Sequence, residues 1–136
     1  MVVLVDTNII IDALADRQPY ASEARMILEK CATDQITGIL AAHSVSNLFY
    51  ILRRNFDIHE RRLLLKNLCQ IFHVSDIDKK KIISALANEQ FSDFEDCLQE
   101  ECAVSDMADF IVTRNKVDFQ KSRVPAVLPE ELLGFA

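Results

Sequence analysis

Short apolar runs alternate with segments of helical periodicity along this chain. Val2–Val5 runs straight into Asp6 and is too short for a helix, so it is predicted to be a buried strand. Four further runs predict the remaining strands, at 36–41, 71–74, 110–112 and 124–128. Between them, apolar residues recur every three or four positions and predict helices that begin near Pro19, cover 44–54, 59–69 and 93–104, follow Asp76 or Asp78, and close the chain at Pro129.

The predicted helices carry expectations about capping and burial. Ser44, or Ser46 if the helix starts later, is expected to cap the helix over 44–54. Glu100 and Glu101 are expected to face solvent. The helix that follows Asp76 or Asp78 is expected to bury Ile82, Ile83 and Leu86. The helix over 93–104 is expected to bury Phe94, Leu98 and Cys102.

Strands that alternate with helices predict an α/β fold with a central parallel sheet. No linker, repeat or low-complexity segment divides the chain, so residues 1–136 are expected to form a single domain. In such sheets, ligands bind beyond the carboxyl ends of the strands. Asp6 stands at such an end, and so does the stretch that begins at Thr113.

Composition narrows the class of protein. Half of the 136 residues are hydrophobic and 26% are charged, which argues against disorder, and two glycines and three prolines argue against a loop-rich β fold. No apolar run approaches the ~20 residues that span a bilayer, and the start lacks the features of a signal peptide, so a cytoplasmic protein is expected. The four cysteines form no C-x-x-C pair, which favours free thiols over a zinc site.

The net charge of −6 argues against a protein that coats nucleic acid non-specifically, because such proteins are normally basic. It leaves open an enzyme that holds nucleic acid through a metal ion and a local basic group. Arg114 is the basic residue nearest to the polar stretches at the strand ends.

Three polar stretches stand where a site could form. They comprise Asp6, Thr7 and Asn8; Asp93, Glu95 and Asp96; and Thr113, Asn115 and Asp118. Clustered carboxylates repel one another unless a cation or a proton lies between them. Oxygen-rich sites with few histidines suit Mg²⁺ or Mn²⁺. Such an ion would polarise a phosphodiester and activate a water molecule.

Each acid also has an ordinary structural interpretation. Asp6 could instead cap the helix that follows its strand. The acids over 93–96 suit the first turn of a helix, where they favour the helix dipole. Asp118 alone is most simply a loop residue. Asp12 is expected on the first helix, in a structural role.

Taken together, the stretches "VDTNIIIDAL", "DFEDCLQ" and "DFIVTRNKVDF" resemble the PIN domain, in the branch that includes VapC-like toxins and related ribonucleases. Their order and spacing agree with that family over essentially the whole chain. The resemblance implies a three-layer α/β/α sandwich with a central parallel sheet, an acidic Mg²⁺ or Mn²⁺ pocket, and endonucleolytic cleavage of single-stranded RNA. It also implies an antitoxin protein as a partner, and a homodimer.

Carried over by position, Asp6, Asp96 and Asp118 are the catalytic acids, and Asp6 and Asp96 hold the metal. Arg114 is the expected contact to RNA. The supporting positions are Asn47, Asp93, Thr113 and Asn115.

The chain departs from the family pattern at the second acid. The family usually has a glutamate on the helix after the second strand, where this chain has Asn47. Asn115 is also neutral. A metal-dependent ribonuclease, the toxin of a toxin–antitoxin pair, is therefore weighed against a catalytically weakened PIN domain that binds RNA or protein. A haloacid-dehalogenase-type phosphatase ranks lower, because it needs a second aspartate where Asn8 stands.

Overall fold

Five parallel strands form one sheet in the computed structural model of the chain, which describes residues 1–135. Their order across the sheet is β3-β2-β1-β4-β5, so the first strand is the central one. The strands are β1 (Val2–Val5), β2 (Thr37–Ala41), β3 (His73–Ser75), β4 (Phe110–Val112) and β5 (Ala126–Val127). The predicted strands and the predicted parallel sheet are confirmed.

Seven α-helices and two short 3-10 helices, η1 and η2, connect the strands within the described residues. They are α1 (Thr7–Leu14), α2 (Ala21–Ala32), α3 (Ala42–Ile51), η1 (Leu52–Arg54), α4 (Ile58–Ile71), α5 (Lys79–Ala87), α6 (Phe94–Ser105), η2 (Lys116–Phe119) and α7 (Pro129–Phe135). None of these helices has the length and apolar character that a bilayer crossing requires.

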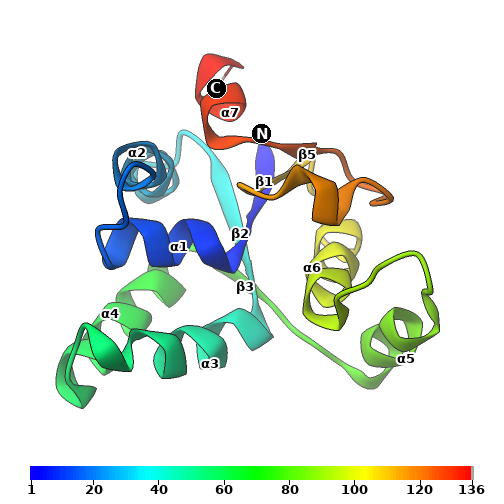
Figure 1. Cartoon of the computed structure of the whole chain (residues 1–136), viewed down its shortest axis with the longest axis horizontal. Coiled ribbons are helices and arrows are strands. Elements are labelled where there is room, and N and C mark those ends of the chain that lie inside the picture. Colours follow the sequence, from blue (N-terminus) through cyan, green and yellow to red (C-terminus); the bar gives the residue numbers. More distant parts are fainter. Residues whose placement is uncertain (136) are drawn as a thin grey trace.

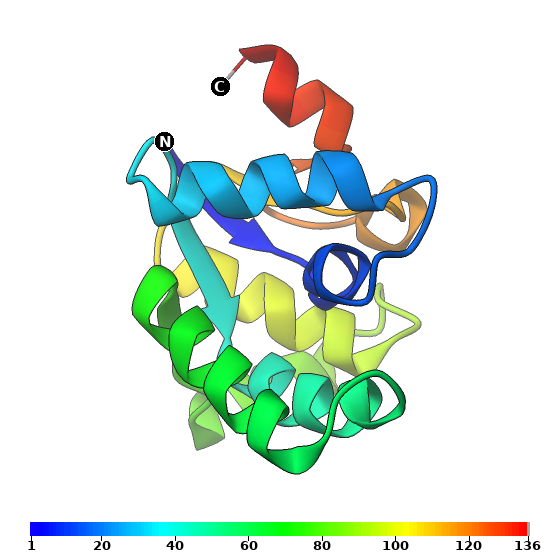
Figure 2. The ribbon, with the colours of Figure 1, turned by 90° about the vertical axis from the view of Figure 1, so that its left-hand side faces the viewer.

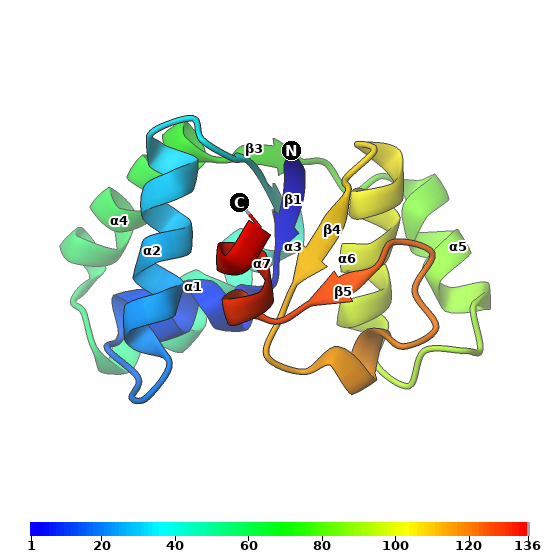
Figure 3. The same cartoon turned by 90° about the horizontal axis from the view of Figure 1, so that it is seen from above.

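The helices cover both faces of the sheet, which gives the three-layer α/β/α arrangement that the sequence predicted. Val3 and Val5 of β1 pack into one core together with residues of α1, α2, α3, α4 and α7. Leu4, which points the other way, packs with Cys102 and Ala103 of α6. Figures 1 and 3 show α1, α2 and α4 on one side of β1, and α5 and α6 on the other. Figure 2 looks onto α2 and α4, with the sheet behind them.

Gly38 in β2 marks a close approach between the sheet and its neighbours. A Cβ at this position would lie 2.6 Å from two ring atoms of Phe72 and 2.8 Å from the sulfur of Cys31. Such distances are far below van der Waals contact. The sequence therefore has the one residue without a Cβ where this ring comes closest to the strand.

The capping prediction for α3 is wrong. β2 continues directly into the helix at Ala42, and Ala41 is the N-cap without any side-chain hydrogen bond. Ser44 lies inside the helix, fully buried, and accepts a hydrogen bond from the hydroxyl of Thr7 at 2.7 Å. Ser46 donates to the carbonyl oxygen of His43 and caps nothing. For α5, Asp78 is the cap, accepting from the backbone N–H of Lys81.

The predicted burial of α5 is also wrong. Ile82, Ile83 and Leu86 are 37%, 55% and 67% exposed, and Ala85 is the one residue of α5 that is buried. α5 lies at the outside of the molecule against α6 (Figure 3). Phe94, at the start of α6, is exposed as well, whereas Leu98 and Cys102 are buried as predicted.

The four cysteines are free thiols, as the sequence predicted. Cys31, Cys97 and Cys102 are buried, and Cys69 on α4 is exposed. Burial raises the pKa of Cys31 to about 12 and that of Cys97 to about 11. The buried thiols are therefore protonated at neutral pH and act as small apolar residues of the core.

Candidate metal site at the carboxyl ends of the strands

An acidic pocket of about 230 Å³ opens at the carboxyl end of the sheet. Asp6 follows β1, His43 lies in the first turn after β2, and Asn115 follows β4, so neighbouring strands deliver all three to one edge. α6 lies against these strands and contributes its first turns. The pocket is lined by Asp6, Thr7, Asn8, His43, Asn47, Ile51, Asp93, Glu95, Asp96, Gln99, Asn115 and Asp118.

Asp6 forms the base of the acidic pocket and is only 4% exposed. It is the N-cap residue of α1, yet its side chain makes no capping hydrogen bond. Gln99 of α6 donates from Nε2 to one carboxylate oxygen at 3.0 Å, and Thr113 donates from its hydroxyl to the other at 2.8 Å. The capping interpretation of Asp6 therefore fails. Two buried donors from distant parts of the chain fix this carboxylate instead.

Asp96 stands one turn before Gln99 on α6 and is half-buried. Burial and, after it, the negative charges of Asp93, Asp6, Asp118 and Glu95 together raise the pKa of its carboxyl to about 7. Asp93 caps α6 by accepting from the backbone N–H of Asp96 at 2.9 Å. The acids of three separate segments therefore repel one another across this pocket.

His43 adds an imidazole ring to the pocket lining. Its Nε2 lies 3.1 Å from the carbonyl oxygen of Glu95. A carbonyl only accepts hydrogen bonds, so Nε2 carries the proton and Nδ1 has a free lone pair. Burial lowers the pKa of the ring, against the opposing effect of Glu95 and the other nearby acids. His43 is therefore neutral at pH 7, as a metal-binding imidazole must be.

The residues of the acidic pocket fit a hard divalent cation. Five carboxylates line the pocket, and its described lining includes neither lysine nor arginine. Two buried side-chain atoms at the pocket, Oε1 of Gln99 and Nδ1 of His43, receive no hydrogen bond from the described residues. A cation would neutralise the five carboxylates and could bind the unpartnered atoms of Gln99 and His43. The side chains of Asn47 and Asn115 supply neutral oxygens to the same pocket.

Two of the predicted site residues lie elsewhere. Thr113 is fully buried behind the acidic pocket, where it holds Asp6 and also accepts from the backbone N–H of Asn115. Arg114 is not among the residues that line the acidic pocket. Its guanidinium binds the carboxylate of Asp12 through two nitrogens and lies 4.1 Å from the ring centre of Tyr20. Asp12 is fully buried, which agrees with its structural interpretation.

Gln99 and His43 belong to the pocket but were not among the predicted site residues. The pattern held a signal for each of them. Gln99 follows Asp96 by three residues on a predicted helix, a spacing that places two side chains on one face. His43 comes two residues after the end of the second predicted strand, at the same edge of the sheet as Asp6.

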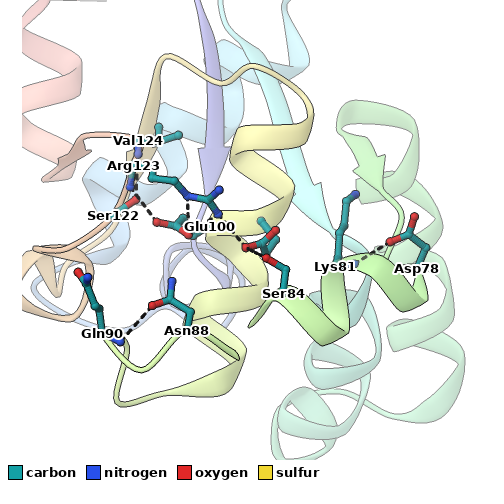
Figure 4. A network of polar contacts seen from close by, with 10 residues as sticks. Asp78, Lys81, Ser84, Asn88, Gln90, Glu100, Ser122, Arg123 and Val124 are labelled. Carbon is teal, nitrogen blue, oxygen red and sulfur yellow. Dashed lines mark hydrogen bonds and ion pairs between the residues drawn. The ribbon is translucent and has the colours of Figure 1, made fainter. Parts of the chain in front are cut away.

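The prediction that Glu100 and Glu101 are solvated is wrong. Glu100 is fully buried and accepts from the backbone N–H of Arg123 at 2.8 Å and from its guanidinium. The same guanidinium lies 2.7 Å from Glu101, whose other partner is the hydroxyl of Ser84. Figure 4 shows Arg123 reaching from the segment after η2 to α6. The network ties the segment that carries Asp118 to the helix that carries Asp96.

Cys97, Glu100 and Glu101 also bring potential ligand atoms within 4.8 Å of one another. The guanidinium of Arg123 already supplies the positive charge between the two carboxylates. This cluster is therefore an ion-pair network that holds the fold. The acidic pocket, whose carboxylates have no such partner among the described residues, is the better candidate for a metal.

Comparisons with known proteins agree with this architecture. In solved structures the chain resembles VapBC2 from Rickettsia felis bound to a promoter DNA fragment (TM-score 0.66, 14% identity, 94% of this chain and 98% of that one). It also resembles a toxin–antitoxin complex from Klebsiella pneumoniae (TM-score 0.69, 21% identity, 93% of this chain and 97% of that one). A third similar structure is VapBC-1 from nontypeable Haemophilus influenzae (TM-score 0.67, 15% identity, 96% of this chain and 99% of that one). Comparison with curated proteins gives no significant match. The family model of the PIN domain matches residues 2–117, and the chain belongs to the PIN domain family.

Proposed function

We propose that this chain is a divalent-metal-dependent endoribonuclease and the toxin of a toxin–antitoxin pair. The observation that carries the proposal is the acidic pocket itself. Five carboxylates converge there from three separate segments, without a lysine or arginine in the described lining. Membership of the PIN family, whose members are generally nucleases, supports the same activity.

Asp6, directly after β1, and Asp96, on α6, would hold the ion, because both line the pocket and the charge of Asp6 acts on the carboxyl of Asp96. Bound Mg²⁺ or Mn²⁺ would polarise the phosphodiester and lower the pKa of a water molecule. Gln99 and Thr113 keep Asp6 in one orientation, so its position does not depend on the ion. Asp118 lies exposed on η2 at the rim, where it can accept a proton from the attacking water.

The substrate we propose is single-stranded RNA. The acidic pocket holds about 230 Å³ and has its most buried carboxylate, Asp6, at its base. A flexible single strand can bend one phosphate into such a pocket, whereas a regular duplex presents its phosphates on a rigid convex surface. The local charge is strongly negative, so the phosphate depends on the cation to approach.

Cleavage of an end-labelled single-stranded RNA tests the proposal. We expect cutting with Mg²⁺ or Mn²⁺, none with EDTA, and a loss on the order of 100-fold or more in Asp6→Asn. Asp78→Asn is the matched control. It makes the same charge change at a helix cap outside the pocket, and asparagine keeps the capping acceptor. Equal activity in wild type and Asp6→Asn would show that the cleavage comes from a contaminant.

Asn47 and Asn115 favour a second candidate, a weakened PIN domain that binds RNA or protein without cutting. Both residues line the acidic pocket with neutral side chains. Calorimetric titration with Mg²⁺ separates the two candidates. A nuclease takes up the ion in the wild type and loses it in Asp6→Asn. A chain that binds RNA without taking up Mg²⁺ or Mn²⁺ supports the second candidate.

The likeness of fold to toxin–antitoxin complexes supports an antitoxin as the protein partner. We propose that it is encoded by the neighbouring open reading frame. Co-expression of the two products should give a stable complex with reduced RNA cleavage. Light scattering of the chain alone measures whether it also forms a homodimer. A neighbouring product that neither binds nor inhibits the chain would contradict the antitoxin assignment.

A further inference from the structure

A second hollow, of about 320 Å³, lies beside the acidic pocket and shares Asn115 with it. This base hollow, as we name it, is lined by Ile9, Asp12, Tyr20, Glu23, Arg114, Asn115, Leu128, Pro129 and Glu130. Its volume is at the small end of ligand pockets, which suits one heteroaromatic ring with its sugar. Because one residue lines both spaces, a nucleotide next to a phosphate in the acidic pocket can reach it.

The lining of the base hollow includes an aromatic ring and a guanidinium group whose charge is compensated. The ring of Tyr20 is 44% exposed, and the guanidinium of Arg114 lies 4.1 Å from its centre. The buried carboxylate of Asp12 also binds that guanidinium, with Nη2 3.2 Å from Oδ1. Arg114 therefore has little free charge to offer a phosphate. Planar aromatic and guanidinium groups are instead the surfaces on which nucleobases stack.

Glu23 gives the base hollow a polar edge. It stands in the first turn of α2, and its Oε2 is buried without a hydrogen-bond partner among the described residues. A carboxylate only accepts hydrogen bonds, so its partner must bring N–H or O–H donors. The rest of the lining includes the apolar side chains of Ile9, Leu128 and Pro129. A ligand that fits is flat, largely apolar on its faces, and rich in donors along one edge.

We propose that the base hollow binds a guanine base of the RNA, next to the phosphate that is cut. Guanine is the one standard base with two adjacent donors, the ring N1–H and the 2-amino group, and these can meet both oxygens of one carboxylate. Adenine and cytosine place an unprotonated ring nitrogen beside their amino group, which a carboxylate repels. Uracil has one N–H between two carbonyl oxygens. The inference rests on the proposed ribonuclease function and adds a base preference to it.

The test compares binding of GMP and IMP to the metal-free protein in EDTA, by equilibrium dialysis and by amide shifts in NMR spectra. The two nucleotides share the phosphate and the sugar, but the base of IMP lacks the 2-amino group. We expect GMP to bind about 10-fold more tightly than IMP, and the shifts to centre on Tyr20, Glu23 and Arg114. Glu23→Gln should abolish this preference. Glu29→Gln, an exposed change on the same helix, should keep it.

Equal binding of GMP and IMP to the wild type would overturn the inference, and so would a preference that survives in a folded Glu23→Gln variant. N-acetylargininamide serves as the competing probe. If it binds more tightly than GMP, the base hollow accepts a basic side chain of a protein partner, and the nucleobase assignment is wrong. A chain that prefers GMP but cuts no RNA keeps the guanine site, without a cut phosphate beside it, and loses the nuclease proposal. A chain that cuts RNA but shows no guanine preference keeps the nuclease proposal and loses the guanine site.

Discussion

Replacing Asp96 by asparagine should stabilise the metal-free protein at alkaline pH. The carboxyl of Asp96 has a pKa of about 7 in the folded chain, because of burial and the surrounding acids, against 3.8 as its ordinary value. Between these two values the folded state holds a proton that the unfolded state has released. Stability therefore falls as the pH rises from about 4 to about 7, and the full penalty remains above pH 7. Asparagine carries no charge and avoids the penalty.

The magnitude follows from the displacement of the pKa. From 3.8 to about 7, at 1.36 kcal/mol per pH unit, the penalty would be ~4 kcal/mol. The carboxyl is only half-buried, so solvent screening reduces this to ~2 kcal/mol. For a chain of 136 residues, that free energy corresponds to about 6–8 °C in melting temperature. We expect this gain in Asp96→Asn at pH 8, shrinking as the pH falls towards 4.

Thermal unfolding in EDTA, followed by circular dichroism from pH 4.5 to 8.5, measures this gain. Glu89→Gln is the control, because it removes one negative charge at an exposed turn residue. It should show no comparable pH-dependent gain. If Asp96→Asn melts at or below the wild-type temperature at pH 8, burial and the nearby acids do not penalise the charged form of Asp96 in the folded state. A gain that is the same at every pH would also refute the reasoning, because its source would then not be a titrating carboxyl.

Three further predictions concern other parts of the chain. Asn47→Glu should let Mg²⁺ raise the melting temperature more than in the wild type, because a close charge pair adds up to a few kcal/mol before desolvation; equal shifts would mean that this residue does not face the metal. Glu100→Gln, which deprives Arg123 of its buried partner, should cost ~3 kcal/mol in urea unfolding, and an unchanged midpoint would contradict the network. Gly38→Ala should cost ~1–3 kcal/mol by the same measurement, because the new Cβ overlaps the ring of Phe72; a neutral result would show that the ring can move away.

The strands and their parallel order could be predicted because the signal is local. Val2–Val5 is a short apolar run that ends in a polar turn, and such a pattern has few alternatives. Burial on α5 could not be predicted in the same way. Helical periodicity marks Ile82, Ile83 and Leu86 as one apolar face, but it does not say whether another element covers that face. In the structure α5 buries only Ala85, so these side chains stay at the surface.

The edge of the sheet that holds the candidate site could also be predicted, because carboxyl ends of parallel strands meet there. Asp6, Asp96 and Asp118 line one pocket, although their roles in metal binding and catalysis stay predictions. The partners of charged residues were harder to foresee. Glu100 looked like a surface acid because its partner, Arg123, stands 23 positions further along the chain. No local pattern reveals a pair that forms only when the fold brings the segment after η2 to α6.

The distribution of thiols allows the folded chain to be labelled at a single cysteine. Cys69 is the exposed one of the four cysteines, and the others are enclosed and protonated. A maleimide dye added at neutral pH would therefore couple to α4 alone, without engineering any cysteine away. Cys69 is not among the residues that line the acidic pocket or the base hollow. A reporter placed there can follow association with RNA or protein while the surfaces under study stay unmodified.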